Sequence, residues 1–386
     1  MMSSVRPFTI AVPQVVLDDL QRRLAATRWP DPAPGAPWEQ GTDRDYLRGL
    51  VAYWQDEFDW RATESRLNTL PQFTALVDGI ELHFVHLRGH GDNPLPLLLT
   101  HGWPSSFLEF EKTVPLLTDP ARHGGDRRDA FDVIVPSLPG YGFSQRPLTR
   151  GMTKQRIAEL WTQLMTEILG YDRFVAHGGD IGAGVTSNLG LHHARHVAAI
   201  HVTAVFPPQF GPTSRPLGAE ELAYQRLTEE WEEEEGAYAH LQRTRPQTLA
   251  YGLHDSPVGL ASWIIEKMRA WSDCGGDLER IFSKEALLAN IMLYWVTDTF
   301  ASSIRLYYDH KHRDRDCDSG TIDVPAAIAL TTEPVDRAPR AWAERTYTDI
   351  RRWTEFPRGG HFIAQEEPAL LVEDLREFFR AFRDEG

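Results

Sequence analysis

Apolar residues near the start of the chain recur every three or four positions, which is the spacing of one face of a helix. Two stretches have this pattern: Val16, Leu17, Leu20 and Leu24, and then Tyr46, Leu47, Leu50, Val51 and Trp54. The proline-rich stretch 29–37 between them excludes regular structure there. Two such helices cannot bury both apolar faces alone, so we expect residues 1–72 to form a helical arm packed against a larger body.

From residue 73 the pattern changes to that of strands. Residues 73–77 and 80–87 flank Asp78-Gly79, a dipeptide typical of a two-residue hairpin turn. Short apolar runs then predict buried parallel strands at residues 95–100, 131–135, 174–176, 198–205 and 324–330. Helical patterns, such as those at 157–169 and 370–382, alternate with these runs. The alternation predicts an α/β fold in which helices cover both faces of a mostly parallel central sheet.

One long segment interrupts this alternation. Residues 210–312 have a helical pattern rich in Trp and Tyr, with no clear strand. We therefore expect a helical lid inserted between two core strands. The chain then divides into the arm at 1–72, the first part of the core at 73–209, the lid at 210–312 and the second part of the core at 313–386.

Charge and composition narrow the functional class. The 386 residues carry a net charge of −15, which disfavours a nucleic-acid partner and docking on an anionic membrane. No run approaches the roughly 18 apolar residues of a membrane span, and the first residues lack the apolar core of a secretory signal. The two cysteines, Cys274 and Cys317, fit a reducing compartment better than a disulfide framework. We expect a cytoplasmic globular protein whose oligomeric state is left open, a homodimer included.

The strongest local motif is Gly178-Gly179-Asp180-Ile181-Gly182, which follows the predicted strand 174–176 and precedes a helix-compatible stretch at 183–191. It resembles the strand–turn–helix elbow that holds the nucleophile of α/β-hydrolases, with Asp in place of the usual Ser. Glycines flank such an elbow because neighbouring Cβ atoms would clash in the tight turn. A glycine turn with a capping aspartate is the alternative interpretation.

A second motif, His101-Gly102-Trp103-Pro104, directly follows the predicted strand 95–100. In hydrolases of this fold that loop supplies one backbone N–H to the oxyanion hole, and the residue after the nucleophile supplies the other. Trp103 and Ile181 are therefore the candidate donors. For the side chain of His101 we favour a structural role.

A third motif, Arg358-Gly359-Gly360-His361-Phe362, places a histidine on a glycine-rich loop late in the chain. The order nucleophile, acid, histidine is that of α/β-hydrolases, which makes His361 the candidate base. The acid that orients it should follow the strand 324–330. Glu333 is the first choice, and Asp336 is the alternative.

Together these motifs make the chain similar to epoxide hydrolases of the microsomal type, almost from end to end. The resemblance also rests on Arg6-Pro7-Phe8, Thr27-Arg28-Trp29-Pro30, Phe58-Asp59-Trp60-Arg61 and Pro136-Ser137-Leu138-Pro139-Gly140-Tyr141-Gly142. It implies that two lid tyrosines, Tyr238 and Tyr307, donate hydrogen bonds to the oxirane oxygen. It also implies that the triad acid usually stands one residue later than Glu333, where this chain has Pro334.

The resemblance implies an enzyme that converts an epoxide and water into a vicinal diol with no cofactor and no metal. Asp180 would attack a ring carbon, and His361 would activate the water that hydrolyses the resulting ester. The aromatic side chains of the lid suggest a hydrophobic epoxide, an aryl-bearing one included. They are Trp231, Tyr238, Trp263, Trp271, Trp295 and Phe300.

Other functions fit the residues less well. A haloalkane dehalogenase shares the Asp elbow, but such enzymes typically hold the halide with an indole where this chain has Ile181. A non-catalytic ligand-binding relative would not need the elbow, the histidine and the oxyanion loop together. Asp314, Asp316 and Asp318 are spaced like the start of a calcium loop, yet Pro325 takes the place of its required Glu.

Overall fold

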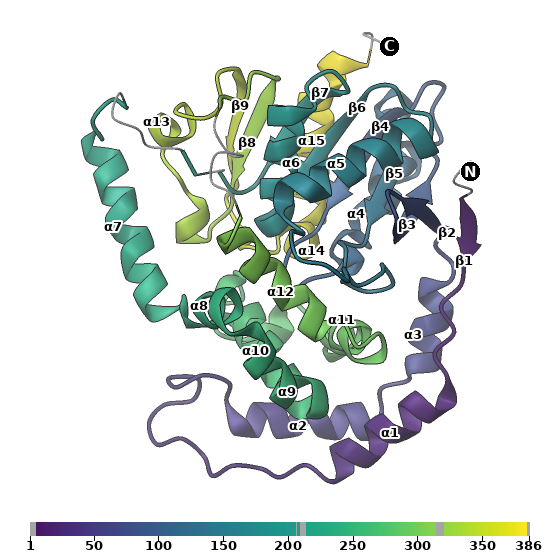
Figure 1. The fold of residues 1–386 in the computed structure, drawn as a ribbon, viewed down its shortest axis with the longest axis vertical. Helices are drawn as coiled ribbons and strands as arrows, with labels where there is room; N and C mark the ends of the chain where they lie inside the picture. Colours follow the sequence, from purple (N-terminus) through teal and green to yellow (C-terminus); the bar gives the residue numbers. More distant parts are fainter. Residues whose placement is uncertain (1–4, 206, 209–213, 314–319, 384–386) are drawn as a thin grey trace.

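A nine-stranded sheet forms the centre of the part of the chain that the computed structural model describes, residues 5–205, 207–208, 214–313 and 320–383 (Figure 1). The strand order is β1-β2-β3-β5-β4-β6-β7-β8-β9. Pairs among β1, β2, β3 and β5 are antiparallel, and the pairs from β5 through β4 to β9 are parallel. The strands are β1 (Arg6–Phe8), β2 (Gln72–Val77), β3 (Ile80–Leu87), β4 (Leu95–Thr100), β5 (Phe131–Pro136), β6 (Phe174–Gly178), β7 (Val197–Val202), β8 (Ala326–Leu330) and β9 (Ile350–Glu355). The predicted mostly parallel α/β sheet is confirmed.

The hairpin β2–β3 forms at the predicted dipeptide. Val77 pairs with Ile80 across Asp78 and Gly79, whose φ angles of 43° and 81° are the left-handed pair that a type I′ turn needs. Two strands lie outside the prediction, and each has a physical reason. β1 has only three residues, which is too short to show a pattern. β9 lies at the sheet edge and carries charged side chains, so its sequence has no apolar run that would predict a strand.

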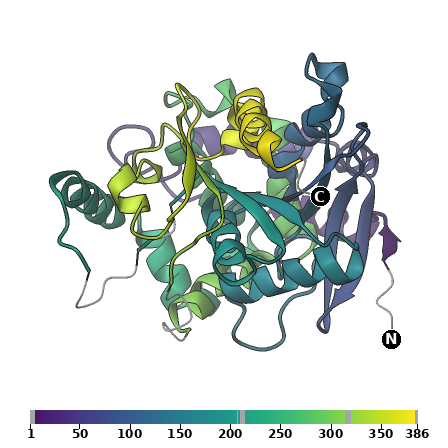
Figure 2. The same cartoon turned by 90° about the horizontal axis from the view of Figure 1, so that it is seen from above.

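Helices cover both faces of the sheet (Figures 1 and 2). On one face lie α5 (Lys154–Gln163), which continues into a π-helical turn at Leu164–Ile168, and α6 (Asp180–His192), which packs on β4, β6 and β7. On the other lie α4 (Thr113–Thr118) and α15 (Pro368–Phe379). α6 is buried from Ile181 to Gly190. Its first residue is therefore fixed at the centre of the fold.

Lid and arm lie beside one another below the sheet in Figure 1. The lid helices are α7 (Ala219–Glu234), α8 (Ala237–Thr244), α9 (Pro246–Asp255), α10 (Pro257–Trp271), α11 (Lys284–Val296) and α12 (Phe300–Lys311). The arm consists of β1, α1 (Gln14–Ala25), α2 (Arg44–Asp56) and α3 (Trp60–Leu67). Helices α1 and α2 pack on α10, and α2 also packs on α11. The arm therefore supports the lid as well as adding a strand to the sheet.

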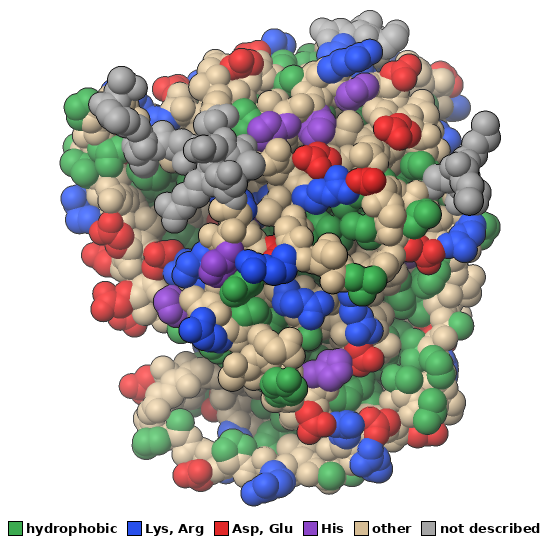
Figure 3. Space-filling model, viewed as in Figure 1, with side chains coloured by type: hydrophobic (Ala, Val, Ile, Leu, Met, Phe, Trp, Pro, Cys, Tyr) green, Lys and Arg blue, Asp and Glu red, His purple; other side chains and the backbone are tan. Residues whose placement is uncertain are grey.

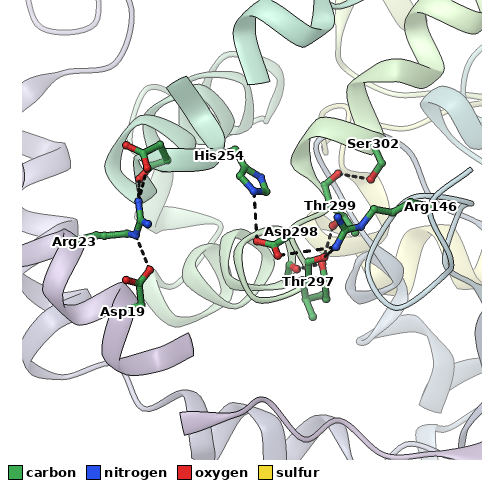
Figure 4. Close-up of polar contacts among 10 residues, drawn as sticks. Asp19, Arg23, Arg146, His254, Thr297, Asp298, Thr299 and Ser302 are labelled. Atoms are coloured by element: carbon green, nitrogen blue, oxygen red, sulfur yellow. Dashed lines mark hydrogen bonds and ion pairs between the residues drawn. The ribbon is translucent and has the colours of Figure 1, made fainter. Parts of the chain in front are cut away.

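Arginine side chains tie the lid to its surroundings (Figure 4). Arg23 of α1 donates through Nη1 to the carbonyl and to Oδ1 of Asp255, at 2.7 and 2.6 Å, and through Nε to Asp19 of its own helix. Arg146, in the loop after β5, donates through Nη2 to the carbonyl of Thr297 at 3.0 Å. One contact joins the lid to the arm at Asp255, and the other joins it to the core at Thr297.

The surface is hollowed between the arm and the lid (Figure 3). This groove, of ≈ 910 Å³, is lined by side chains from residues 22–47 and 255–266. On the face seen in Figure 3, positive and negative side chains are interspersed. The groove is open to solvent and is separate from the residues that the sequence identifies as candidates for catalysis.

Three findings concern the described residues only. None of their helices is both long enough and apolar enough to cross a membrane. No group of three or more His, Cys, Asp or Glu side chains among them is placed to hold a metal ion. Cys274 is a buried free thiol. Cys317 and the acidic residues Asp314, Asp316 and Asp318 lie outside the described part of the chain.

Candidate active site

The nucleophile elbow forms where β6 meets α6. Asp180 is the first residue of α6 and has a φ of 51°, a left-handed conformation that side-chain-bearing residues rarely adopt. The turn is closed by glycines at the positions that the motif predicts. A Cβ at Gly178 would lie 2.3 Å from the carbonyl carbon of Gly182, and one at Gly182 would lie 1.9 Å from the Thr100 oxygen. The backbone therefore holds the Asp180 carboxylate at the carboxyl edge of the sheet.

The neighbouring strand brings the oxyanion loop to the same place. Thr100, the last residue of β4, pairs in register with Gly178, so both strands end side by side. The backbone N–H of Trp103 donates to Asp180 Oδ1 at 2.8 Å. Ile181 is the second residue of α6, and the first N–H groups of a helix have no partner within it. The Trp103 N–H thus contacts the Asp180 carboxylate, and the role of the Ile181 N–H stays a prediction.

His361 lies between two carboxylates. Its Nε2 is 3.8 Å from Asp180 Oδ2, and its Nδ1 donates to Asp336 Oδ2 at 2.9 Å. Burial alone would lower the pKa of the imidazole, but the charges of Asp336, Asp180 and Glu109 outweigh burial and raise the pKa to about 10. In the resting site the imidazole is therefore protonated and is held by charge on both sides.

The contact with Asp336 reverses the order in which the sequence ranks the two carboxylates. After β8 the chain makes a 3₁₀ turn, Pro334–Asp336, which places Asp336 on the imidazole. Glu333 precedes this turn and its carboxylate does not hydrogen-bond the His361 ring. Burial and the charge of Asp336 raise the pKa of Glu333 to about 7. Asp336 is thus the carboxylate that orients His361, and the first choice, Glu333, is corrected.

The two predicted lid tyrosines pack on the indole of Trp103, the residue whose backbone N–H contacts Asp180. Tyr238 of α8 stacks on the indole of Trp103 at 5.3 Å, and Tyr307 of α12 meets the same indole edge-on at 6.1 Å. Their ring centroids are 6.2 Å apart. Burial, and then the negative charge of Asp180, raise the pKa of Tyr238, while burial, Tyr238 and Asp180 raise that of Tyr307. Both hydroxyls therefore stay protonated and can act as hydrogen-bond donors.

Glu366 fixes the loop that carries His361, a role that the sequence does not reveal. Its carboxylate accepts hydrogen bonds from the backbone N–H groups of Gly360, Phe362 and Asp273, at 2.9, 3.0 and 2.8 Å. The His361 N–H donates to the carbonyl of Trp271, the last residue of α10, at 2.8 Å. The position of His361 is therefore coupled to the end of a lid helix.

The lid also holds the oxyanion loop through two polar residues of α11. Asn290 donates through Nδ2 to the carbonyl of Pro104 at 2.7 Å, and the hydroxyl of Tyr294 donates to the carbonyl of Ser105 at 2.6 Å. Asn290 is the one amide in an otherwise apolar stretch of α11, which is the only sequence signal for this role. The carbonyls of the loop are thereby turned toward the lid, which leaves the Trp103 N–H for Asp180.

The side chain of His101 has structural contacts, in line with the role favoured from the sequence. Its Nδ1 donates to the carbonyl of Gly102 at 3.0 Å, and its Nε2 accepts from the Leu138 N–H at 3.2 Å. Burial lowers the pKa of His101 to about 4, so the ring is neutral. It connects the oxyanion loop to the loop after β5.

The aromatic residues of the lid divide into two groups. Trp271 lies 5.0 Å from the Tyr238 ring and 6.5 Å from that of Trp103, and Trp231 contacts Trp271 at 6.2 Å. These rings pack around Tyr238. The others serve the lid core: Trp263 donates to Gln242, and Trp295 and Phe300 are buried in the apolar core.

Comparisons with known proteins identify the family to which the chain is similar. The family model described as "Epoxide hydrolase N terminus" matches residues 5–110, and the one described as "alpha/beta hydrolase fold" matches residues 96–234. A putative epoxide hydrolase of Stigmatella aurantiaca is 46% identical over 381 residues, covering 98% of this chain and 86% of the relative. Epoxide hydrolase 1 of Oryctolagus cuniculus is 34% identical, covering 97% and 88%.

Solved structures show the same fold along nearly the whole chain. The juvenile hormone epoxide hydrolase of Bombyx mori superposes with a TM-score of 0.88 at 27% identity, covering 99% of this chain and 95% of that one. The epoxide hydrolase of Aspergillus niger superposes with a TM-score of 0.83 at 31% identity, covering 98% and 96%. The arm, the core and the lid are thus all shared with these proteins.

Proposed function

This chain belongs to the microsomal-type epoxide hydrolase family and is an epoxide hydrolase, and we propose that it hydrolyses hydrophobic epoxides through an ester on Asp180. One observation carries the proposal. The Asp180 carboxylate accepts from the Trp103 N–H and lies 3.8 Å from the imidazole that Asp336 orients, and two protonated tyrosines pack on the Trp103 ring. Such a site combines a nucleophile, an acid and a base in the order that epoxide opening requires.

The first step opens the ring. One Asp180 oxygen attacks an oxirane carbon, and the C–O bond to the ring oxygen breaks. Because an alkoxide is a poor leaving group, Tyr238 and Tyr307 hydrogen-bond this oxygen and one of them transfers its proton. The products are a 2-hydroxyalkyl ester on Asp180 and a tyrosinate, which the protonated His361 nearby stabilises by charge.

The second step hydrolyses the ester. Esterification removes the charge of Asp180, which lowers the pKa of His361 and releases its proton, by way of solvent, to the tyrosinate. Neutral His361 then takes a proton from a water whose oxygen bonds to Asp180 Cγ. The tetrahedral oxyanion is stabilised by the N–H groups of Trp103 and Ile181. On collapse the alkoxide takes the proton from His361, the diol leaves, and the carboxylic acid of Asp180 gives its proton to His361, which restores the resting ion pair.

The proposed substrate class rests on the aromatic residues packed around the tyrosines. Trp103 and Trp271 are buried against Tyr238, at 0% and 3% exposure, and Trp231, which contacts Trp271, is partly buried. An epoxide that reaches the tyrosines therefore meets an aromatic environment, which favours an aryl substituent over a small alkyl one. We expect kcat/KM for an aryl-substituted oxirane to exceed that for a short alkyl oxirane by about 10-fold or more. A cytoplasmic location remains the prediction made from the sequence.

A direct assay tests the proposal. Purified protein is incubated with a panel of aryl and alkyl oxiranes, and the vicinal diol is measured by chiral chromatography. We expect diol from the wild type and a loss of about 10³-fold or more with Asp180→Asn, because an amide is a far weaker nucleophile. Tyr251→Phe changes an exposed residue of α9, 74% accessible and outside the site, and as the control variant it should form diol at the wild-type rate. Equal diol formation by wild type and Asp180→Asn would overturn the proposal.

A further inference from the structure

A small cavity adjoins Asp180 and His361. It is lined by Gly102, Trp103, Ser105, Glu109, Gly179, Asp180, His361 and Phe362, and its volume is ≈ 10 Å³. That is the room that one buried water needs. The wall contains polar groups on several sides, so the cavity suits a water and not an apolar group. A water bound here would touch the nucleophile and the base at once.

Glu109 is the one ionisable side chain of this wall to which the mechanism above assigns no contact. It lies in the 3₁₀ turn Phe107–Phe110, which Ser106 caps, and its side chain is 8% exposed. Its Oε2 accepts from the Gly102 N–H at 3.4 Å. Burial raises the pKa of Glu109 to about 7, and the charge of Asp180 adds to this rise. Hydrogen bonds from Gly102 and Ser105 and the charge of His361 act in the opposite direction and lower the pKa. Glu109 thus lies next to the ester-forming Asp180 although burial of its ionised carboxyl group there is unfavourable.

We propose that Glu109 positions the hydrolytic water, which occupies this cavity and donates one hydrogen bond to His361 Nε2 and the other to the Glu109 carboxylate. The inference rests on the proposed function, because it concerns the hydrolysis of the Asp180 ester. With both hydrogens directed at these groups, a lone pair of the water oxygen points at Asp180 Cγ. Glu109 takes no proton in the step; His361 remains the base. Glu109 is a positioning residue for the second half of the reaction.

Two charges that act on Glu109 change when the ester forms. The Asp180 carboxylate, which raises the pKa of Glu109, becomes neutral, and His361, which lowers it, gives up its proton before it acts as the base. A carboxyl oxygen of Glu109 can accept a hydrogen bond from the water in either protonation state, so the positioning role rests on the geometry of the cavity.

The experiment separates the two half-reactions. Glu109→Gln keeps the size of the side chain and an oxygen for the Gly102 N–H, but it removes the charged acceptor. Single-turnover mixing with an aryl oxirane, followed by rapid quench and intact-mass analysis, gives the rates of ester formation and ester hydrolysis. We expect hydrolysis to slow by about 10- to 100-fold, the effect of losing a hydrogen bond to a charged group, while ester formation stays within about 3-fold. The ester should then accumulate during steady-state turnover.

Two further variants make the result decisive. Glu111→Gln removes a carboxylate two residues on, where it pairs with Arg66 at the surface, and should leave both rates as in the wild type. Glu109→Asp keeps the carboxylate but shortens the side chain by one methylene. Its rate of ester hydrolysis should lie between those of the wild type and Glu109→Gln. An unchanged hydrolysis rate in Glu109→Gln, or an equal fall in both rates, would overturn the inference. Failure of the wild type to form any ester would instead overturn the proposed function.

Discussion

His361 donates from Nδ1 to Asp336 Oδ2 at 2.9 Å, and its opposite nitrogen lies 3.8 Å from Asp180 Oδ2. The first contact fixes the ring orientation and, in the neutral imidazole, the tautomer that leaves Nε2 free to take a proton. The second distance is longer than a hydrogen bond, so the Asp180 oxygen is not sequestered by the base. His361 therefore leaves Asp180 free to attack the epoxide, and it acts as the base only after Asp180 has become an ester.

The role of Asp336 predicts a sharp difference between two carboxylates. We expect Asp336→Asn to lower kcat for diol formation by about 10²- to 10⁴-fold, because the amide no longer stabilises the imidazolium. Glu333→Gln, which changes a carboxyl group that does not bond the ring, should remain within about 3-fold of the wild type. A greater loss in Glu333→Gln than in Asp336→Asn, measured in the same diol assay, would contradict this assignment.

The division of labour between Asp180 and His361 predicts a trapped intermediate. His361→Gln keeps the nucleophile and the tyrosines but lacks the base, so ester formation should proceed and hydrolysis should slow by about 10³-fold or more. Intact-mass spectrometry after mixing with an aryl oxirane should show the protein plus one substrate mass. Full turnover by this variant, or the absence of any adduct, would be inconsistent with His361 as the base.

The tyrosines should affect the other half-reaction. Tyr238→Phe and Tyr307→Phe each remove one donor to the departing oxygen, and we expect each to slow ester formation by about 10- to 100-fold. Hydrolysis of an ester already formed should change much less. The exposed Tyr251→Phe serves as the matched control. If the two variants slow hydrolysis more than ester formation, the hydroxyls act elsewhere in the reaction.

The raised pKa of His361 also predicts a pH dependence of stability. Because the folded state holds this proton with a pKa of about 10, against the ordinary histidine pKa of 6.5, the linked stabilisation is complete below pH 6.5 and is lost as the pH rises toward 10. The free energy of unfolding of the wild type, relative to that of His361→Gln, should therefore fall across this range in urea titrations. A difference that is constant between pH 6.5 and 10 would show that the folded protein does not raise this pKa.

Hydrophobic pattern was sufficient for most of the fold. Strands β4 to β8 are largely buried on both faces, so their sequences are continuous apolar stretches that predict strands. The dipeptide Asp78-Gly79 predicts the hairpin between β2 and β3. β9 could not be found in this way, because its side chains are charged and only partly buried. The elbow and the oxyanion loop were visible because their glycines are required by close backbone contacts, as at Gly182.

The acid and the supporting residues depend on geometry that no local pattern contains. Whether Glu333 or Asp336 reaches His361 is decided by a 3₁₀ turn of three residues. Glu366 acts through backbone N–H groups on two segments about 90 residues apart, Asp273 and Gly360–Phe362, which the lid brings together only in the folded chain. Such roles arise from tertiary contacts and leave little trace in the spacing of residue types.

The most direct measurement follows oxygen from water during a single turnover in H₂¹⁸O with enzyme in excess over epoxide. If the reaction passes through an ester on Asp180, water attacks the Cγ of that residue, so peptide mapping should find ¹⁸O in the Asp180 carboxylate. The diol of that first turnover should carry the unlabelled oxygen that Asp180 supplied. Label in the diol after one turnover, with none on Asp180, would show that water attacks the epoxide directly and would contradict the account.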